Sequence, residues 1–321
     1  MIRCLSHYGM GGLNMNNYII ETNNLTKMYG GQTVVDGVTL HVKKGRIYGL
    51  LGRNGAGKTT IMKMILGLTP ITSGEVDIFG QHIKGQEKKL YPRIGAIIET
   101  PGFYPNLTGT ENLEIFAKLR GTAAPEAVKK ALSVVGLPYK DKKLYSKYSL
   151  GMKQRLGIAN AILHDPELLI LDEPTNGLDP IGIAEVRNFI KHLSVECGKT
   201  ILISSHILSE IAVLADDIGI IDRGILLEEN SMLELEKKNR KYALLHVSDI
   251  PKAAVVLERQ FGITEYSVQD GNALRIYETE ADMAAINKAL MVQDIAVSGF
   301  QLCNDTLEDY FKKITGGEGI A

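Results

Sequence analysis

The sequence predicts an α/β fold with a parallel sheet over its first two thirds, followed by a small α+β domain. Continuous apolar runs lie at residues 46–51, 168–171 and 200–203, and such runs are typical of strands buried on both faces of a parallel sheet. Helical patterns separate these runs along the chain. A charged stretch at residues 237–241 reads as a linker before a second alternation of strands and helices. Because 321 residues suit about two domains, we expect the chain to divide there.

The composition is that of an ordinary globular protein, and it restricts the partners. The formal net charge is −1, so no broad basic excess indicates nucleic-acid binding. Cys4, Cys197 and Cys303 lie far apart and form no CxxC pair. This argues against a disulfide scaffold or a zinc ribbon and fits a reducing cytoplasm. No apolar run approaches the roughly 18–20 residues needed to cross a bilayer, so we expect no membrane-spanning segment.

The first residues of the chain show neither helix nor strand periodicity, and no apolar stretch of a signal peptide follows Arg3. Met15 directly precedes the first patterned segment. Glycine codons, as at Gly11 and Gly12, can spell the purine-rich GGAGG of a bacterial ribosome-binding site. We therefore expect translation to start at Met15, with residues 1–14 an over-extended reading frame. A disordered N-terminal arm is the alternative.

A phosphate-binding loop is the most specific motif of the chain. Residues 52–59 read GRNGAGKT and match G-x-x-x-x-G-K-[ST] in full, between a predicted strand and a predicted helix. Glycines let backbone N–H groups converge on phosphate oxygens, and the start of the helix adds its positive dipole. We expect Lys58 to place its charge between the β- and γ-phosphates and Thr59 to bind Mg²⁺ through its hydroxyl. The residues of this segment expected to bind ATP are Gly52, Asn54, Gly55, Ala56, Gly57, Lys58, Thr59 and Thr60.

Two adjacent carboxylates, Asp172 and Glu173, end the predicted strand at 168–171. Ligands of α/β proteins bind at the carboxyl ends of the strands, so both side chains are expected near the phosphates. Asp172 is the expected partner of Mg²⁺ through water, and Glu173 is the expected general base for the attacking water. A solvated acidic strand end is the alternative for the dipeptide alone, and the presence of the phosphate loop argues against it.

These motifs and four further features together resemble the ATP-binding subunit of an ABC transporter. Residues 148–155 read YSLGMKQR, where that family carries its LSGGQ signature, and residues 176–180 read NGLDP, as in its D-loop. His206 stands where the family has its switch histidine, and Tyr29 where an aromatic ring stacks on adenine. The resemblance covers residues 18–225. It implies an ABC ATPase core of the P-loop NTPase (RecA-like) class with an antiparallel β subdomain and a helical subdomain at about 100–160.

The resemblance also implies a homodimer in which two copies meet head to tail and enclose two ATP molecules. Each phosphate loop would then face the signature of the other copy, where Ser149 and Gly151 are expected to donate to the γ-phosphate. Leu150 and Met152 depart from the family signature. His206 is expected to hold the attacking water, and with Glu173 and Lys58 it completes the expected catalytic set. An ordinary helix N-cap for Ser149 and a packed loop residue for His206 are the alternatives.

Glu99 is the most informative difference from the family, whose members usually have a glutamine at this position. An ionised carboxylate only accepts hydrogen bonds. We therefore expect Glu99 to bind Mg²⁺ more strongly than an amide does, yet to repel the γ-phosphate. A side chain that points to solvent is the alternative. The expected metal set is thus Thr59, Asp172 and Glu99.

Glu99, the run ETPGFYPNLT that it begins and the SLGMKQR signature resemble the ATPases of bacitracin-resistance and lantibiotic-immunity exporters. This resemblance implies a subunit that hydrolyses ATP to power the export of a peptide antibiotic. It also implies separately encoded membrane permease subunits and a cytoplasmic position at the inner face of the cell membrane. Phe103 and Tyr104 are candidate contacts to the permease, and burial in the helical subdomain is the alternative for both.

Residues 15–236 are expected to form the ATPase domain and residues 241–321 an accessory α+β domain. The accessory domain shows the order βαββαβ, as in a split ferredoxin-like unit. Its expected strands are 242–247, 263–268, 273–277 and 295–302, and its expected helices are 251–260, 282–291 and 307–314.

Other ATPases with these motifs fit the sequence less well. The segment between Glu99 and Ser149 is too short for the long coiled coil of a condensin-like ATPase, and no sustained heptads are present. Soluble translation-associated ATPases carry two cassettes, whereas this sequence shows one. A non-transport or regulatory ATPase subunit that acts without its own permease remains the alternative function. The intact Lys58, His206 and carboxylate pair favour hydrolysis.

Overall fold

The computed structural model describes residues 17–99, 102–122, 125–238, 241–269, 272–277, 282–304 and 307–315. The chain divides into two compact units, the first ending at Met232 and the second beginning at Leu233. Residues 1–14 and Met15 lie outside the described residues, so the expected start of translation stays a prediction.

A six-stranded sheet forms the centre of the first unit, in the order β11-β10-β4-β9-β8-β7. All neighbouring strands are parallel except the pair β10 and β11. The buried strands β4, β8 and β9 correspond to the three predicted apolar runs, so this expectation is confirmed. The bounds are β4 Ile47–Leu51, β7 Ile94–Ile97, β8 Leu168–Asp172, β9 Thr200–Ser205, β10 Asp217–Asp222 and β11 Ile225–Ser231.

An antiparallel sheet accompanies the parallel one. Its long strand β1 pairs with β2, β3 and β5, and β5 pairs with β6. The bounds are β1 Tyr18–Tyr29, β2 Gln32–Val38, β3 His41–Lys43, β5 Ser73–Ile78 and β6 Gln81–His82.

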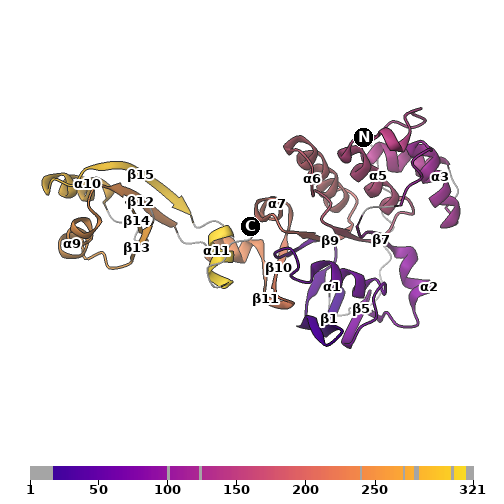
Figure 1. Ribbon diagram of the computed structural model, residues 1–321, viewed down its shortest axis with the longest axis horizontal. Helices are drawn as coiled ribbons and strands as arrows, with labels where there is room; N and C mark the ends of the chain where they lie inside the picture. The colour runs from indigo at the N-terminus through magenta and orange to yellow at the C-terminus, as the bar shows by residue number, and fades with distance from the viewer. Residues whose placement is uncertain are drawn as a thin grey trace. The chain divides into compact units, whose positions relative to one another are not determined.

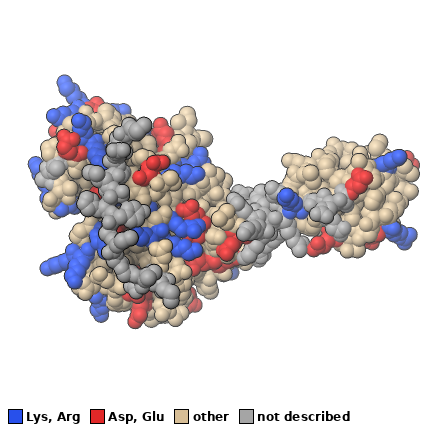
Figure 2. Space-filling model, turned by 180° about the vertical axis from the view of Figure 1, so that it is seen from behind, with Lys and Arg blue, Asp and Glu red and all other residues tan. Residues whose placement is uncertain are grey.

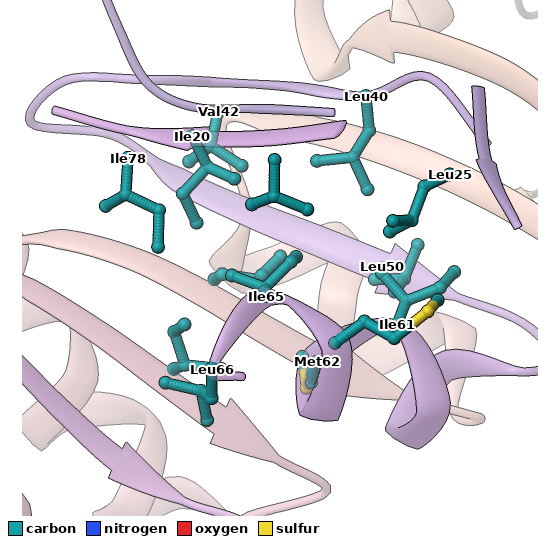
Figure 3. Packing of buried hydrophobic residues seen from close by; sticks show 14 of the residues in the cluster. Ile20, Leu25, Leu40, Val42, Leu50, Ile61, Met62, Ile65, Leu66 and Ile78 are labelled. Atoms are coloured by element: carbon teal, nitrogen blue, oxygen red, sulfur yellow. The ribbon is translucent and has the colours of Figure 1, made fainter. Parts of the chain in front are cut away.

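Helix α1 (Lys58–Ile65) packs between the two sheets. Figure 3 shows Ile61 and Ile65 of this helix against Ile20 and Leu25 of β1 and Leu50 of β4, all completely buried. Because α1 packs against both sheets, its first turn and the phosphate loop before it are held in place.

Helices cover the other side of the parallel sheet. In Figure 1, α5 and α6 lie on one side of β9 and β7, and α1 with β1 and β5 lie on the other. The expected helical subdomain at about 100–160 contains α3 (Gly109–Leu119), α4 (Pro125–Val134), the 3₁₀ helix η2 (Tyr145–Lys147) and α5 (Leu150–Ile162). The remaining helices of the first unit are α2 (Glu87–Leu90), the 3₁₀ helix η1 (Tyr91–Arg93), α6 (Pro180–Val195) and α7 (Leu208–Leu214).

The second unit has a four-stranded antiparallel sheet in the order β13-β14-β12-β15, with the chain order βαββαβ expected of a split ferredoxin-like unit. Ile263 is buried but precedes the strand that was expected to include it. The bounds are β12 Lys241–Val247, α9 Ile250–Phe261, β13 Tyr266–Gln269, β14 Ala273–Ile276, α10 Met283–Val292, β15 Val297–Asn304 and α11 Leu307–Ile314.

The charged stretch expected to be a linker is helical in part, which corrects that expectation. Helix α8 (Met232–Lys238) runs into it, because leucine, glutamate and lysine are strong helix formers. On the face drawn in Figure 2, basic and acidic side chains are interspersed over both units, in keeping with the net charge of −1. Within the described parts of the chain, we find no helix with the length and apolar character needed to span a membrane.

Candidate functional site

The phosphate loop joins β4 to α1 and depends on glycine at two positions. Gly57 precedes the helix with a φ of 106°, a left-handed conformation that glycine adopts readily. A Cβ at Gly52 would lie 2.4 Å from the carbonyl oxygen of Ile221, so only glycine fits there. The Gly224 amide donates to the Ala56 carbonyl at 3.0 Å and ties the loop to the β10–β11 turn. Among the other expected ATP-binding residues, Asn54 and Gly55 are exposed, Ala56 is buried, and Thr59 and Thr60 are half-buried.

The Lys58 ammonium lies inside the loop, and its side chain is 4% exposed. It donates to the carbonyl oxygens of Gly52 at 2.7 Å and Arg53 at 3.0 Å, and it lies 3.2 Å from Oε1 of Glu173. These contacts satisfy a buried cation that would otherwise be costly. The structure therefore places one positive charge at the centre of the loop, where the sequence predicts phosphates.

Thr59 and Asp172 meet as predicted, although they are far apart in the sequence. Because β4 and β8 are parallel strands of one sheet, the loop after β4 and the end of β8 lie at the same edge. The Thr59 hydroxyl donates to Oδ2 of Asp172 at 2.7 Å. A hydroxyl and a carboxylate this close suit a hard cation such as Mg²⁺, which takes oxygen ligands.

Ser204 links the two carboxylate residues, and sequence reasoning did not identify it as a site residue. Its hydroxyl donates to Oδ1 of Asp172 at 2.6 Å and accepts from the Glu173 amide at 2.9 Å. Ser204 is completely buried and stands directly opposite Asp172 in the pairing of β9 with β8. The pairing of these strands is the signal that identifies it, and a single sequence does not supply that pairing.

Glu173 lies between Lys58 and His206. Its Oε2 is 3.0 Å from Nδ1 of His206, and its Oε1 faces Lys58. The backbone of Glu173 has a φ of 44°, a left-handed conformation that costs on the order of 1–3 kcal/mol in a residue other than glycine. Such strain collects at functional sites. The three residues expected to be catalytic are therefore brought together, while their roles stay predictions.

The signature residues form the start of helix α5. The Ser149 hydroxyl accepts from the Met152 amide at 3.3 Å, so Ser149 acts as the N-cap that was the alternative for it. The Leu150 side chain lies 3.0 Å from where a Cβ of Gly177 would stand. The signature thus packs against the expected D-loop of the same chain. Donation by Ser149 and Gly151 to a partner's phosphate stays a prediction.

Among the described residues, Tyr29 and Glu99 each contact a lysine rather than Thr59 or Asp172. Tyr29 ends β1, is 48% exposed and has the Lys27 ammonium 4.6 Å from its ring centre. Glu99 follows β7 and binds Lys63, with 2.6 Å between Oε1 and Nζ. This hydrogen bond raises the pKa of Lys63. The described residues hold no group of three or more acidic, histidine or cysteine side chains able to bind a metal ion, so Glu99 as a ligand stays a prediction.

Phe103 and Tyr104 differ in their surroundings. Phe103 is buried and packs edge-on against Phe116 and Tyr145 at 5.5 and 5.2 Å, as in the alternative of a core residue. Tyr104 is 51% exposed. Its backbone amide donates to the buried Asn112 side chain, which also donates to the Tyr104 carbonyl. Tyr104 therefore remains the candidate for a partner contact.

Replacing Ser204 with Ala should lower the free energy of unfolding by about 1–3 kcal/mol, because the Asp172 carboxylate and the Glu173 amide both lose a buried partner. ATP turnover should fall as well, since Glu173 loses the contact that orients its backbone. Urea unfolding and phosphate release measure the two effects. Ser194→Ala, which removes another buried hydroxyl from helix α6, should leave turnover unchanged. Equal turnover in the two variants would contradict this role of Ser204.

A phosphate loop on β4, an acidic pair on β8 and a histidine after β9 define an ATPase of the P-loop class. Residues 35–176 match the family model described as ABC transporter. The chain is 56% identical to the bacitracin transport ATP-binding protein BcrA of Enterococcus faecalis, over 95% of this chain and 98% of that protein. It is 46% identical to the lantibiotic transport ATP-binding protein SrtF of Streptococcus pyogenes, over 66% of this chain and 90% of that protein.

A solved structure described as the ATP binding subunit of an ABC transporter superposes with a TM-score of 0.61 at 29% identity. The match covers 68% of this chain and 92% of that one. The chain belongs to the ATP-binding proteins of ABC transporters, and it binds and hydrolyses ATP. The resemblance inferred from the motifs is confirmed.

Proposed function

We propose that this chain powers the export of a peptide antibiotic of the bacitracin or lantibiotic type. The observation that carries the proposal is the extent of the similarity to a bacitracin transport ATP-binding protein, which includes the second unit as well as the ATPase core. The lantibiotic relative, matched over a shorter part of the chain, supports the wider class of substrate.

The proposed assembly contains two copies of this chain and separately encoded permease subunits. The permease would hold the ATPase at the inner face of the cell membrane. The two copies would meet head to tail, so that the phosphate loop of one faces Ser149 and Gly151 of the other. Residues 15–236 act as the ATPase domain in this proposal and residues 241–321 as an accessory domain.

The proposed reaction transfers the γ-phosphoryl group of ATP to water, and the contacts around Glu173 support the roles of the residues. Glu173 accepts the proton of the water that attacks the γ-phosphorus, as the bond to ADP breaks. Lys58 supplies positive charge against the phosphates. His206, whose Nδ1 contacts Glu173, would donate to the γ-phosphate and hold the attacking water. Thr59 and Asp172 would hold Mg²⁺, which when bound offsets the phosphate charge. Glu99, the third expected ligand, has one carboxylate oxygen in contact with Lys63.

Resistance assays test the export of an antibiotic directly. A sensitive bacterium that expresses this chain with the permease encoded beside it should tolerate more bacitracin, or more of a lantibiotic, than one with the permease alone. Lys58→Met is the matched control and should abolish the gain. Normal ATP hydrolysis without protection against either class would contradict the proposed substrate and favour a regulatory ATPase.

Replacing Tyr104 with Ala should leave hydrolysis by the isolated chain unchanged and weaken its binding to permease-containing vesicles about five- to thirtyfold, because exposed aromatic side chains often anchor interfaces. Co-sedimentation measures the binding. Tyr104→Phe keeps the ring and should bind as the wild type does. Unchanged binding of the alanine variant would place the permease contact elsewhere.

A further inference from the structure

The contact between Lys63 and Glu99 is the part of the site that the function above leaves unexplained. Lys63 lies on α1 one turn beyond Thr59, and its ammonium is 2.6 Å from Oε1 of Glu99. The charge of Asp172 also acts on Lys63. The pair thus lies beside the hydroxyl and carboxylate that are the candidates for holding Mg²⁺.

The stability of the fold does not account for this pair. The Lys63 side chain is 31% exposed and that of Glu99 is 68% exposed, and exposed ion pairs contribute little to stability. Glu99 also has a left-handed φ of 63°, which is unfavourable for a residue with a Cβ. The ion pair is weak, and the backbone of Glu99 is strained. Both residues lie at the edge of the sheet where the phosphate loop follows β4, which points to a role in the site.

The negative charge of Glu99 explains why Lys63 lies next to it. A glutamine at this position would be neutral and would need no counter-charge. An ionised carboxylate adds a negative charge next to Asp172 and to the loop that receives the phosphates of ATP. An ammonium in direct contact cancels most of that charge, and its three N–H groups leave it able to hold the carboxylate in one place.

We propose that Lys63 is a positioning residue, which holds the Glu99 carboxylate away from the Thr59–Asp172 pair and cancels its repulsion of ATP. The proposal rests on the ATP site assigned above. With Lys63 present, the ammonium offsets the negative charge of Glu99 when ATP binds. Without Lys63, the free carboxylate opposes the binding of the phosphates.

A double-mutant cycle in nucleotide binding tests the proposal. The four chains are the wild type, Glu99→Gln, Lys63→Gln and the double variant. Their dissociation constants for a fluorescent ATP analogue are measured by titration, in EDTA and again with Mg²⁺. Lys63→Gln should raise the constant in EDTA about three- to tenfold, because no cation then offsets the free carboxylate. The increase should be smaller with Mg²⁺.

The Glu99→Gln variant distinguishes a role of Lys63 through Glu99 from direct action of Lys63 on the phosphates. There, removal of Lys63 should change the constant by no more than about twofold, since no carboxylate remains to be neutralised. If replacing Lys63 lowered the affinity for the analogue equally in the wild type and in Glu99→Gln, Lys63 would act on the phosphates by itself, and the proposal would be overturned. Unchanged affinity in both proteins would overturn it too.

Two controls separate this result from the site assignment. Lys129→Gln makes the same charge change on the exposed face of α4 and should bind as the wild type does. Failure of the wild type to bind the analogue would count against the ATP site. Normal binding by the wild type, with additive effects of Lys63→Gln and Glu99→Gln on the dissociation constant, would count only against the proposed role of Lys63.

Discussion

Glu173→Gln is expected to slow ATP hydrolysis by about 10²–10⁴-fold while leaving ATP binding intact. The amide keeps the shape of the side chain but cannot take the proton from water. Its neighbours remain in place, because Oε1 still faces Lys58 and the backbone amide still donates to Ser204. The loss is therefore expected in the chemical step and not in the affinity for nucleotide.

The variant is also expected to accumulate as a dimer that encloses ATP, because hydrolysis is the step that would release the two copies. Light scattering on a size-exclusion column should show twice the mass of the wild type in MgATP and a monomer in MgADP. Glu75→Gln, the same chemical change at an exposed position on β5, should hydrolyse ATP normally and remain monomeric. Normal hydrolysis by Glu173→Gln would show that another group is the base.

The sequence predicted well the parts of the site that are contiguous in the chain. The phosphate loop needs glycines, a lysine and a hydroxyl at set spacings, and the apolar run before Asp172 and Glu173 identifies a buried parallel strand. Parallel strands bring their ends to one edge, so the meeting of Thr59 with Asp172 also followed. The antiparallel and helical subdomains followed from the family resemblance.

The remaining contacts depend on which strands are neighbours and on where loop side chains point. Ser204 bridges Asp172 and Glu173 because β9 lies next to β8, an order that periodicity does not reveal. The contact of Glu99 with Lys63 joins a loop to a helix that is distant in the chain. The two adjacent aromatic residues after Glu99 have the same local pattern, yet packing buries Phe103 and leaves Tyr104 exposed.

Lys58→Met is expected to raise the dissociation constant for ATP by at least about 10²-fold, which is the largest effect on binding predicted for this site. Charge-assisted hydrogen bonds each contribute about 1.5–3 kcal/mol, and an ammonium against two phosphates makes more than one. The change also removes the donor to the Gly52 and Arg53 carbonyls and the cation beside Glu173. The loop itself should therefore loosen.

Thermal unfolding separates loss of the nucleotide site from loss of the fold. At an ATP concentration of about 100 times the dissociation constant, binding stabilises the wild type by about 2.7 kcal/mol, which raises Tm by roughly 5–10 °C. In Lys58→Met this ATP-dependent rise should vanish, while the far-ultraviolet circular dichroism stays that of the wild type. Lys129→Met changes the same residue type on α4 and should keep the full rise. A full rise in Lys58→Met as well would mean that the buried ammonium ties the loop together but does not bind the phosphates.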